Sequence, residues 1–162
     1  MSWTNLENKV VVVTGGAAGI GLAVVKGFVE VGAKVMIADF AEEVGVKAVE
    51  ESNQAGSGEA AFAKCDVTSK ADVDELIEKT VERWDSIDVL VNNAGINNPS
   101  QKNAHEEDEH LFESVLDTNL KGAFLCTKYA VKNMMENRSG TIINNSSVLD
   151  SKATHSSSTS YH

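Results

Sequence analysis

The chain has 162 residues, a length that fits one domain better than two. It carries 14 Lys and Arg against 24 Asp and Glu, and the formal net charge of -10 argues against binding nucleic acid, whose phosphates it would repel. No apolar run reaches the ~20 residues of a membrane span, and residues 1–8 lack the pattern of a signal peptide. Cys65 and Cys126 have no metal-like spacing, so we expect two reduced, buried thiols in a cytoplasmic protein.

Strands and helices are predicted to alternate along the whole chain. Continuous apolar, β-branched runs predict buried parallel strands over 10–13, 34–38, 60–64, 88–91 and 140–145. Apolar residues at helical spacing predict helices over 20–31, 42–54, 71–84, 106–117 and 120–137. In the first helix the spacing places Ile20, Val24, Phe28 and Val31 on the inward face. The alternation predicts an α/β fold, a single doubly wound parallel sheet over residues 1–162 with helices on both faces.

A glycine-rich turn, Thr14-Gly15-Gly16-Ala17-Ala18-Gly19-Ile20-Gly21, leaves the first strand and opens the first helix. Glycines at 15, 19 and 21 lack the Cβ atoms that would keep a pyrophosphate away, and the helix N-terminus offers free N–H groups and a positive dipole end. Such a turn can be only a turn, but a strand before it and a helix after it are what a dinucleotide-binding motif requires. We therefore expect four residues to bind the cofactor: Gly15, Gly19, Ile20 and Gly21.

Asp39 closes the second predicted strand, and a carboxylate at this place can accept hydrogen bonds from the two ribose hydroxyls of NAD. The same carboxylate would repel the 2′-phosphate of NADP. Phe40 follows Asp39 where an NADP site would favour a basic residue, and the glycine turn holds no Lys or Arg. These features predict NAD as the cofactor, and the alternative role for Asp39 is that of a helix cap.

Two short motifs follow the third and fourth strands. Asp66 can accept a hydrogen bond from the amino group of an adenine ring, against which Val67 would pack. In Asn92-Asn93-Ala94-Gly95, small residues let the backbone approach a cofactor and asparagine side chains can tie neighbouring strands, although an ordinary Asn-Gly turn is the alternative. The residues expected to border the cofactor here are Asn93, Ala94 and Gly95.

One stretch has a superficial likeness to a zinc protease motif. His105 and His110 enclose acidic residues, but they are five positions apart rather than four, so they point in different directions on a helix. A solvated, acidic helix start accounts for the stretch better, and we expect no metal site.

Together these motifs resemble the short-chain dehydrogenases/reductases, whose TGxxxGIG turn, acidic NAD selector, Asp-Val pair and NNAG segment match residues 14–21, 39, 66–67 and 92–95. The resemblance runs from about Lys9 to the last residue. It implies a Rossmann-like fold with strand order 3-2-1-4-5 and an NAD-dependent oxidoreductase that moves a hydride between NAD(H) and a secondary alcohol or ketone. It also implies a homo-oligomer, a dimer or a tetramer, for the full-length protein.

The resemblance assigns three catalytic residues. Asn119 matches the family's helical Asn, which would hold a water on the proton path. Ser147, the second serine after the fifth strand, would orient the substrate oxygen; alternation along the strand points Ser146 the other way. Tyr161 matches the first residue of the family's YxxxK and would give or take the hydroxyl proton.

The sequence also departs from the family pattern. The segment between Ser147 and Tyr161 is a residue or so longer than usual, and the lysine of YxxxK falls beyond His162. We therefore expect the sequence to be the N-terminal two-thirds of such an enzyme, truncated at the C-terminus without its last strands. Without the ammonium of that lysine, Tyr161 is expected to stay protonated near pH 7, and the chain alone to be inactive.

Two other functions fit parts of the pattern. A non-catalytic NAD-binding module or short isoform would need the glycine turn and Asp39 but has no use for Ser147 and Tyr161. A methyltransferase with an adenosyl cofactor would need neither the NNAG segment nor the serine and tyrosine. The polar stretch 96–105 favours a polyol or sugar-like substrate, with an acyl-chain ketone or a steroid as open alternatives.

Overall fold

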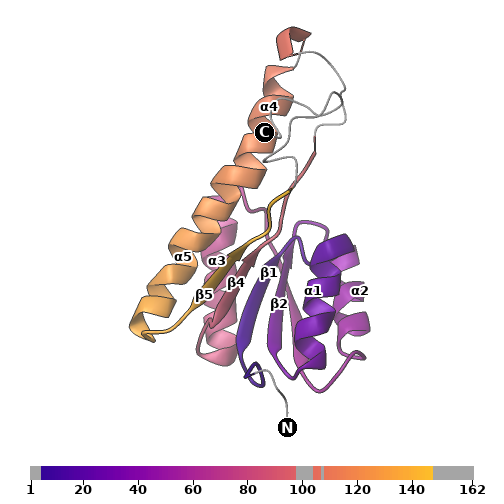
Figure 1. The fold of residues 1–162 in the computed structure, drawn as a ribbon, viewed down its shortest axis with the longest axis vertical. Helices are drawn as coiled ribbons and strands as arrows, with labels where there is room; N and C mark the ends of the chain where they lie inside the picture. Colours follow the sequence, from indigo (N-terminus) through magenta and orange to yellow (C-terminus); the bar gives the residue numbers. More distant parts are fainter. Residues whose placement is uncertain (1–4, 98–103, 107, 148–162) are drawn as a thin grey trace.

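The computed structural model of the chain describes residues 5–97, 104–106 and 108–147 (Figure 1). Its five strands are all parallel and form one sheet in the predicted order β3-β2-β1-β4-β5. The strands are β1 (Val10–Thr14), β2 (Lys34–Asp39), β3 (Glu59–Lys64), β4 (Val89–Asn92) and β5 (Thr141–Asn144). The chain winds outward from β1 to β3 and then crosses back to β4, so the order reverses between β1 and β4. Open α/β sheets bind ligands at the carboxyl end of such a switch point.

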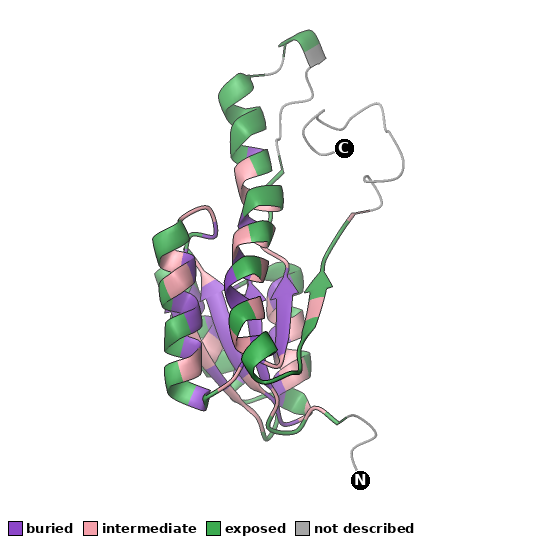
Figure 2. Ribbon diagram, turned by 90° about the vertical axis from the view of Figure 1, so that its left-hand side faces the viewer, coloured by how far each residue is buried: buried purple, intermediate pink, exposed green. Residues whose placement is uncertain are grey.

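Helices cover both faces of the sheet, as Figures 1 and 2 show. Side chains of α1 (Gly19–Glu30) and α2 (Glu42–Ser52) pack with one face, and those of α3 (Lys70–Trp84) and α5 (Ala123–Glu136) with the other. Alternate residues of β1 enter the two cores: Val10 and Val12 in one, Val11 and Val13 in the other. Burial on both faces explains why the strand sequence is continuously apolar rather than alternating.

The long helical segment that precedes β5 differs from the prediction of two separate helices. A short 3-10 turn (Ala104–Glu106) comes first, and α4 then begins at Glu109 and ends at Leu116. Asp108 caps α4 by accepting from the N–H groups of His110 and Leu111. A π-helical segment, Asp117–Gly122, joins α4 directly to α5, so that one rod rises past the carboxyl ends of the strands (Figure 1).

The inward face of α1 also differs from the prediction. Gly21, Val25 and Val29 are its buried residues, whereas Ile20 is 68% exposed. The reason lies in the glycine turn: a Cβ on Gly21 would lie 2.1 Å from the Gly15 carbonyl oxygen, so the backbone at position 21 is pressed against the turn. The face that continues from Gly21 at four-residue spacing therefore meets the sheet, and Ile20 projects from the sheet's carboxyl edge.

Both cysteines are buried and carry free thiols, as predicted. Burial is the main cause that raises the pKa of each thiol to about 12. Because the thiolate is the reactive form, Cys65 and Cys126 are inert core residues.

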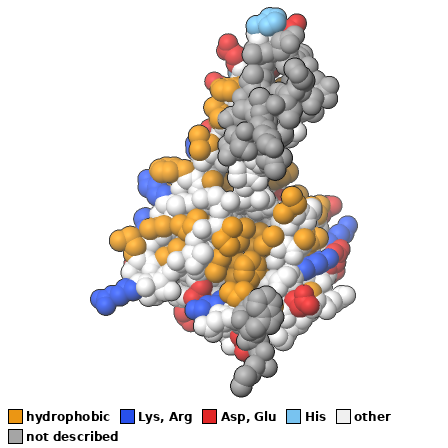
Figure 3. Space-filling model, viewed as in Figure 1, with side chains coloured by type: hydrophobic (Ala, Val, Ile, Leu, Met, Phe, Trp, Pro, Cys, Tyr) orange, Lys and Arg blue, Asp and Glu red, His pale blue; other side chains and the backbone are white. Residues whose placement is uncertain are grey.

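Several apolar side chains remain at the surface on the β5 side of the molecule. Every residue of β5 is at least partly exposed, and Ile143 is 44% exposed. The α4–α5 rod adds Phe112, Leu120 and Phe124. Figure 3 shows hydrophobic side chains in a band from the α5 side of this view to the α1 side. No helix within the described ranges is long and apolar enough to cross a membrane.

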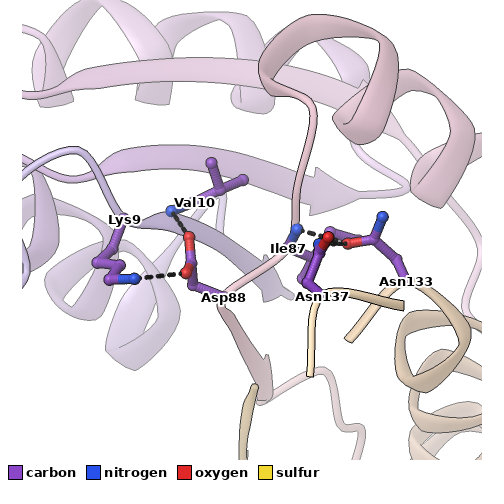
Figure 4. A network of polar contacts seen from close by, with 6 residues as sticks. All are labelled: Lys9, Val10, Ile87, Asp88, Asn133 and Asn137. Carbon is purple, nitrogen blue, oxygen red and sulfur yellow. Dashed lines mark hydrogen bonds and ion pairs between the residues drawn. The ribbon is translucent and has the colours of Figure 1, made fainter. Parts of the chain in front are cut away.

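The amino ends of the strands are held by a polar network (Figure 4). Asp88 accepts from the Val10 N–H at 2.9 Å and from the Lys9 ammonium at 2.7 Å, which joins the starts of β1 and β4. Asn133 Oδ1 accepts from the Ile87 N–H at 2.8 Å and from Asn137 Nδ2 at 3.1 Å, which ties the end of α5 to the same place.

We expect Asp88→Ala to lower the free energy of unfolding by about 2 kcal/mol, because it leaves the N–H of the buried Val10 without its charged acceptor. Lys9→Met is the matched control. The Lys9 side chain is 41% exposed, so losing only the ion pair should cost less than about 1 kcal/mol. Urea unfolding measures both. Equal losses for the two variants would show that the ion pair, and not the backbone hydrogen bond, carries the network.

Candidate functional site

Thr14 joins the two strands at the switch point. Its Oγ1 accepts from the backbone N–H groups of Asn93 and Ala94, each at 3.0 Å, and donates to the Val91 carbonyl at 3.4 Å. The hydroxyl is buried, with Thr14 only 1% exposed. One side chain at the end of β1 thus fixes the backbone that leaves β4.

Asparagine side chains tie the neighbouring strands, as the sequence predicted. Asn93 Nδ2 donates to the carbonyls of Thr14 and Gly15 at 3.0 and 3.2 Å. Asn92 is 5% exposed, and its Nδ2 donates to Thr127 Oγ1 on α5 and to Asn144 Oδ1 on β5, at 3.0 and 2.9 Å. The segment therefore holds together β1, β4, β5 and α5.

The glycines of the turn serve different purposes. A Cβ on Gly15 would lie 2.9 Å from Ala94 Cα, and one on Gly21 would lie 2.6 Å from Asn93 Nδ2. These two glycines make room for the protein's own atoms, and the expectation that they also make room for a pyrophosphate stays a prediction. Of the four glycines in this turn, only Gly19, with a φ of +55°, has no neighbouring atom within 4 Å of its Cβ position.

The N-terminus of α1 begins at this open position. Within the described residues, no side chain caps α1 and no acidic residue lies in its first turn. Its first N–H groups and positive dipole end therefore face the carboxyl edge of the sheet at Gly19, and this arrangement suits an anion such as a pyrophosphate.

Asp39 lies directly beside the glycine turn. Its Oδ2 accepts from the Ala17 N–H at 3.2 Å, and its Oδ1 accepts from the Ala41 N–H at 3.1 Å just before α2. The second contact lies in the turn before α2 but is not the alternative role of a helix cap, because the N-cap residue of α2 is Ala41 and no side chain caps this helix. Each oxygen keeps accepting capacity, so the same carboxylate can also receive ribose hydroxyls. Phe40, the next residue, is 73% exposed.

Asp66 and Val67 follow β3 at the neighbouring strand end, where the Cys65 N–H donates to the Asp39 carbonyl at 3.0 Å. Asp66 is exposed, and its Oδ1 accepts from the N–H and the hydroxyl of Thr68. Val67 is only 7% exposed and packs against Gly122. Most of the Val67 side chain therefore packs in the core, and only its small exposed part is accessible to an adenine ring.

Asn119 lies in the π-helical segment and grips the backbone that follows Gly95. Its Oδ1 accepts from the Ile96 N–H at 2.9 Å, and its Nδ2 donates to the Ile96 carbonyl at 3.0 Å. A Cβ on Gly95 would lie 3.3 Å from Asn119 Oδ1. The amide thus acts on the chain that leaves β4, and the water predicted at Asn119 stays a prediction.

Ser147 follows β5 at the same edge of the sheet and is partly buried, whereas Ser146 is exposed. Tyr161 lies outside the described residues, so its proximity to Ser147 stays a prediction. Sequence reasoning missed Thr14, Thr127 and Asn145 as parts of the site's framework. A polar residue at the end of a buried strand could have indicated Thr14, and the Asn-Asn pair directly before the two serines could have indicated Asn145, whereas Thr127 inside α5 had no such signal. Within the described residues, no cluster of His, Cys, Asp and Glu could hold a metal ion.

Two glycines of α1 provide a test of the close approach at the turn. Gly21→Ala should lower the free energy of unfolding by about 3 kcal/mol, because the added methyl overlaps backbone atoms that cannot easily move. Gly27→Ala, in the same helix but with nothing within 4 Å of its Cβ position, should raise stability by up to about 1 kcal/mol. Thermal unfolding distinguishes the two. A neutral Gly21→Ala would mean that the turn can open without cost.

The comparisons with known proteins agree with the geometry. Residues 9–161 match the family model described as short chain dehydrogenase. Secoisolariciresinol dehydrogenase of Forsythia intermedia is 38% identical over 143 residues, 88% of this chain and 50% of the relative. Momilactone A synthase of Oryza sativa subsp. japonica is 39% identical over 160 residues, 97% of this chain and 57% of the relative.

A solved structure, described as NAD+-bound xylitol dehydrogenase, superposes with a TM-score of 0.91 at 29% identity, covering 98% of this chain and 60% of that one. The chain spans about half the length of the curated relatives it matches. The family match over nearly all of the sequence, together with the sheet order and the glycine turn, shows that the chain belongs to the short-chain dehydrogenase family.

Proposed function

We propose that the full-length protein is an oxidoreductase that transfers a hydride between NAD(H) and a secondary alcohol or ketone. One observation carries the proposal: the Asp39 carboxylate lies against the glycine turn, 3.2 Å from the Ala17 N–H, beside the one glycine that opens outward. A ribose recognised by Asp39 and a pyrophosphate at the N-terminus of α1 would be adjacent parts of one dinucleotide.

Charge supports NAD rather than NADP. A 2′-phosphate would stand where Asp39 places a carboxylate. No Lys or Arg occurs in the turn sequence 14–21, and Phe40 extends into solvent where a basic side chain would be needed. The solved relative described as NAD+-bound adds support by similarity.

The proposed roles of the chain's residues follow their places at the carboxyl edge. Bound NAD(H) would supply the hydride acceptor or donor. Asp66 would bind the adenine amino group, and Asn119 would hold a water on the proton path. Ser147 would orient the substrate oxygen, and Tyr161 would exchange its proton. The presence of Ser147 at the edge that carries Asp39 favours an enzyme over a non-catalytic NAD-binding module.

For the substrate we propose a secondary alcohol, with polyols as the first class to test. The solved relative is described as a xylitol dehydrogenase, and the polar stretch 96–105 agrees with a hydroxylated ligand. We further propose a cytoplasmic protein, on the strength of its two free thiols. A homo-oligomer is supported by the exposed apolar side chains of the α4–α5 rod.

Titration with NADH and NADPH, followed by nicotinamide fluorescence, tests the cofactor. We expect NADH to bind at least about tenfold more tightly, a difference of about 1.4 kcal/mol. Asp39→Ser combined with Phe40→Arg should remove or reverse the preference, because it replaces a repelling charge with an attracting one. Glu43→Gln is the control, since it removes a nearby exposed charge without touching the turn. Equal binding of both cofactors by the unaltered chain would refute the assignment of Asp39.

Turnover tests the chemistry. A polypeptide of these 162 residues contains Tyr161 without a lysine four positions later, so we expect it to show little dehydrogenase activity. In the full-length protein, Tyr161→Phe should lower kcat by about 10²–10⁴-fold, the usual contribution of a general acid–base. Readily measured NAD-dependent polyol oxidation by the 162-residue polypeptide would contradict both the proton role of Tyr161 and its dependence on the lysine.

A further inference from the structure

The Asn93 side chain stands at the centre of the framework around the glycine turn. Its Nδ2 donates to the carbonyls of Thr14 and Gly15, at 3.0 and 3.2 Å. It also fills the space that a Cβ on Gly21 would need, 2.6 Å away. The amide therefore fixes the orientation of the Thr14 and Gly15 carbonyls, where the glycine turn begins. It also limits how closely the start of α1 can approach these carbonyls.

The other end of the amide is held from β5. Asn93 Oδ1 accepts from Asn145 Nδ2 at 3.0 Å. An amide with carbonyl acceptors at its nitrogen and a donor at its oxygen has one favourable orientation, since rotating it by half a turn would bring oxygen against two carbonyls. The Asn145 backbone is fixed as well, because its N–H donates to the Asn92 carbonyl at 2.9 Å.

We propose that Asn145 is a positioning residue for the cofactor: by holding the Asn93 amide it fixes the glycine turn that receives the dinucleotide's pyrophosphate. The inference rests on the proposed NAD-binding function. Asn145 precedes Ser147 by two residues, so the strand that leads to the proposed substrate-orienting serine also holds the cofactor turn. Loosening this contact should weaken pyrophosphate binding and leave adenosine recognition, assigned to Asp39 and Asp66, unchanged.

The neighbouring Asn144 provides a matched comparison. Asn145 acts as a donor to Asn93, whereas Asn144 Oδ1 acts as an acceptor from Asn92 Nδ2 at 2.9 Å. A carboxylate can accept but cannot donate. Asn144→Asp should therefore keep its contact, and Asn145→Asp should lose one, although both variants add one negative charge at adjacent positions of the same strand end.

The experiment measures NADH and ADP-ribose binding by the full-length protein without substitutions and by its Asn144→Asp and Asn145→Asp variants, with adenosine binding by saturation-transfer NMR as the reference. Thermal unfolding of the same samples monitors stability. We expect Asn145→Asp to bind NADH and ADP-ribose about three- to tenfold more weakly than Asn144→Asp, the range for loss of one hydrogen bond. Adenosine should bind all three proteins equally, an outcome that a general loosening of the fold would not give.

Equal NADH affinities of the two variants, with NADH binding by the protein without substitutions intact, would overturn the role of Asn145 and leave the proposed function standing. A parallel loss of adenosine binding in Asn145→Asp would also overturn it, since the effect would then be one of folding. Failure of the full-length protein without substitutions to bind NADH would overturn the proposed NAD-binding function and this inference with it.

Discussion

The rest of the site depends on the close approach of two backbone segments at the switch point between β1 and β4. The Thr14 hydroxyl accepts hydrogen bonds from two successive backbone N–H groups just after β4. Gly15 has no Cβ, and a Cβ there would collide with Ala94. The close contact is possible because the segment at the end of β1 has a small buried hydroxyl at Thr14 and no side chain at Gly15. The segment after β4 has only a small side chain at Ala94. Any side chain at Gly15 or Gly21 would separate the segments before it met a cofactor. The glycines at 15 and 21 are therefore needed for packing within the protein, and the open backbone at Gly19 is the part of the turn that a ligand can approach.

The central strands could be predicted from the sequence because β1, β2 and β4 are almost wholly buried on both faces, whereas the strand order followed from the family resemblance. A continuous apolar run such as residues 10–13 is typical of that environment and of few others. The predictions failed where local geometry overrides the apolar pattern. Ile20 has the hydrophobicity of a core residue, but the contact of Gly21 with the turn rotates it outward. The π-helical segment from Asp117 to Gly122 has no sequence pattern of its own, so a break between two helices was predicted there.

The sequence predicted where the residues of the candidate site lie better than it predicted which contacts they make. The position of Asp39 beside the turn follows from strand order alone, since carboxyl ends of adjacent parallel strands share one edge. Its two backbone hydrogen bonds do not follow from order, because they depend on how the turn bends. Likewise Val67 occupies the expected place after β3, yet the small size of Gly122 on the opposing helix draws most of its side chain into the core.

The two catalytic candidates that the structure describes are each attached to the cofactor framework through the main chain. Asn119 holds Ile96, which directly follows Gly95, and Ser147 stands two residues after Asn145, which holds Asn93. Their positions are therefore set by the same contacts that shape the proposed dinucleotide site. Because the motif residues themselves make these contacts, the motifs could indicate the place of the proposed cofactor site. The choice of the proposed substrate would then depend on side chains that this framework does not hold.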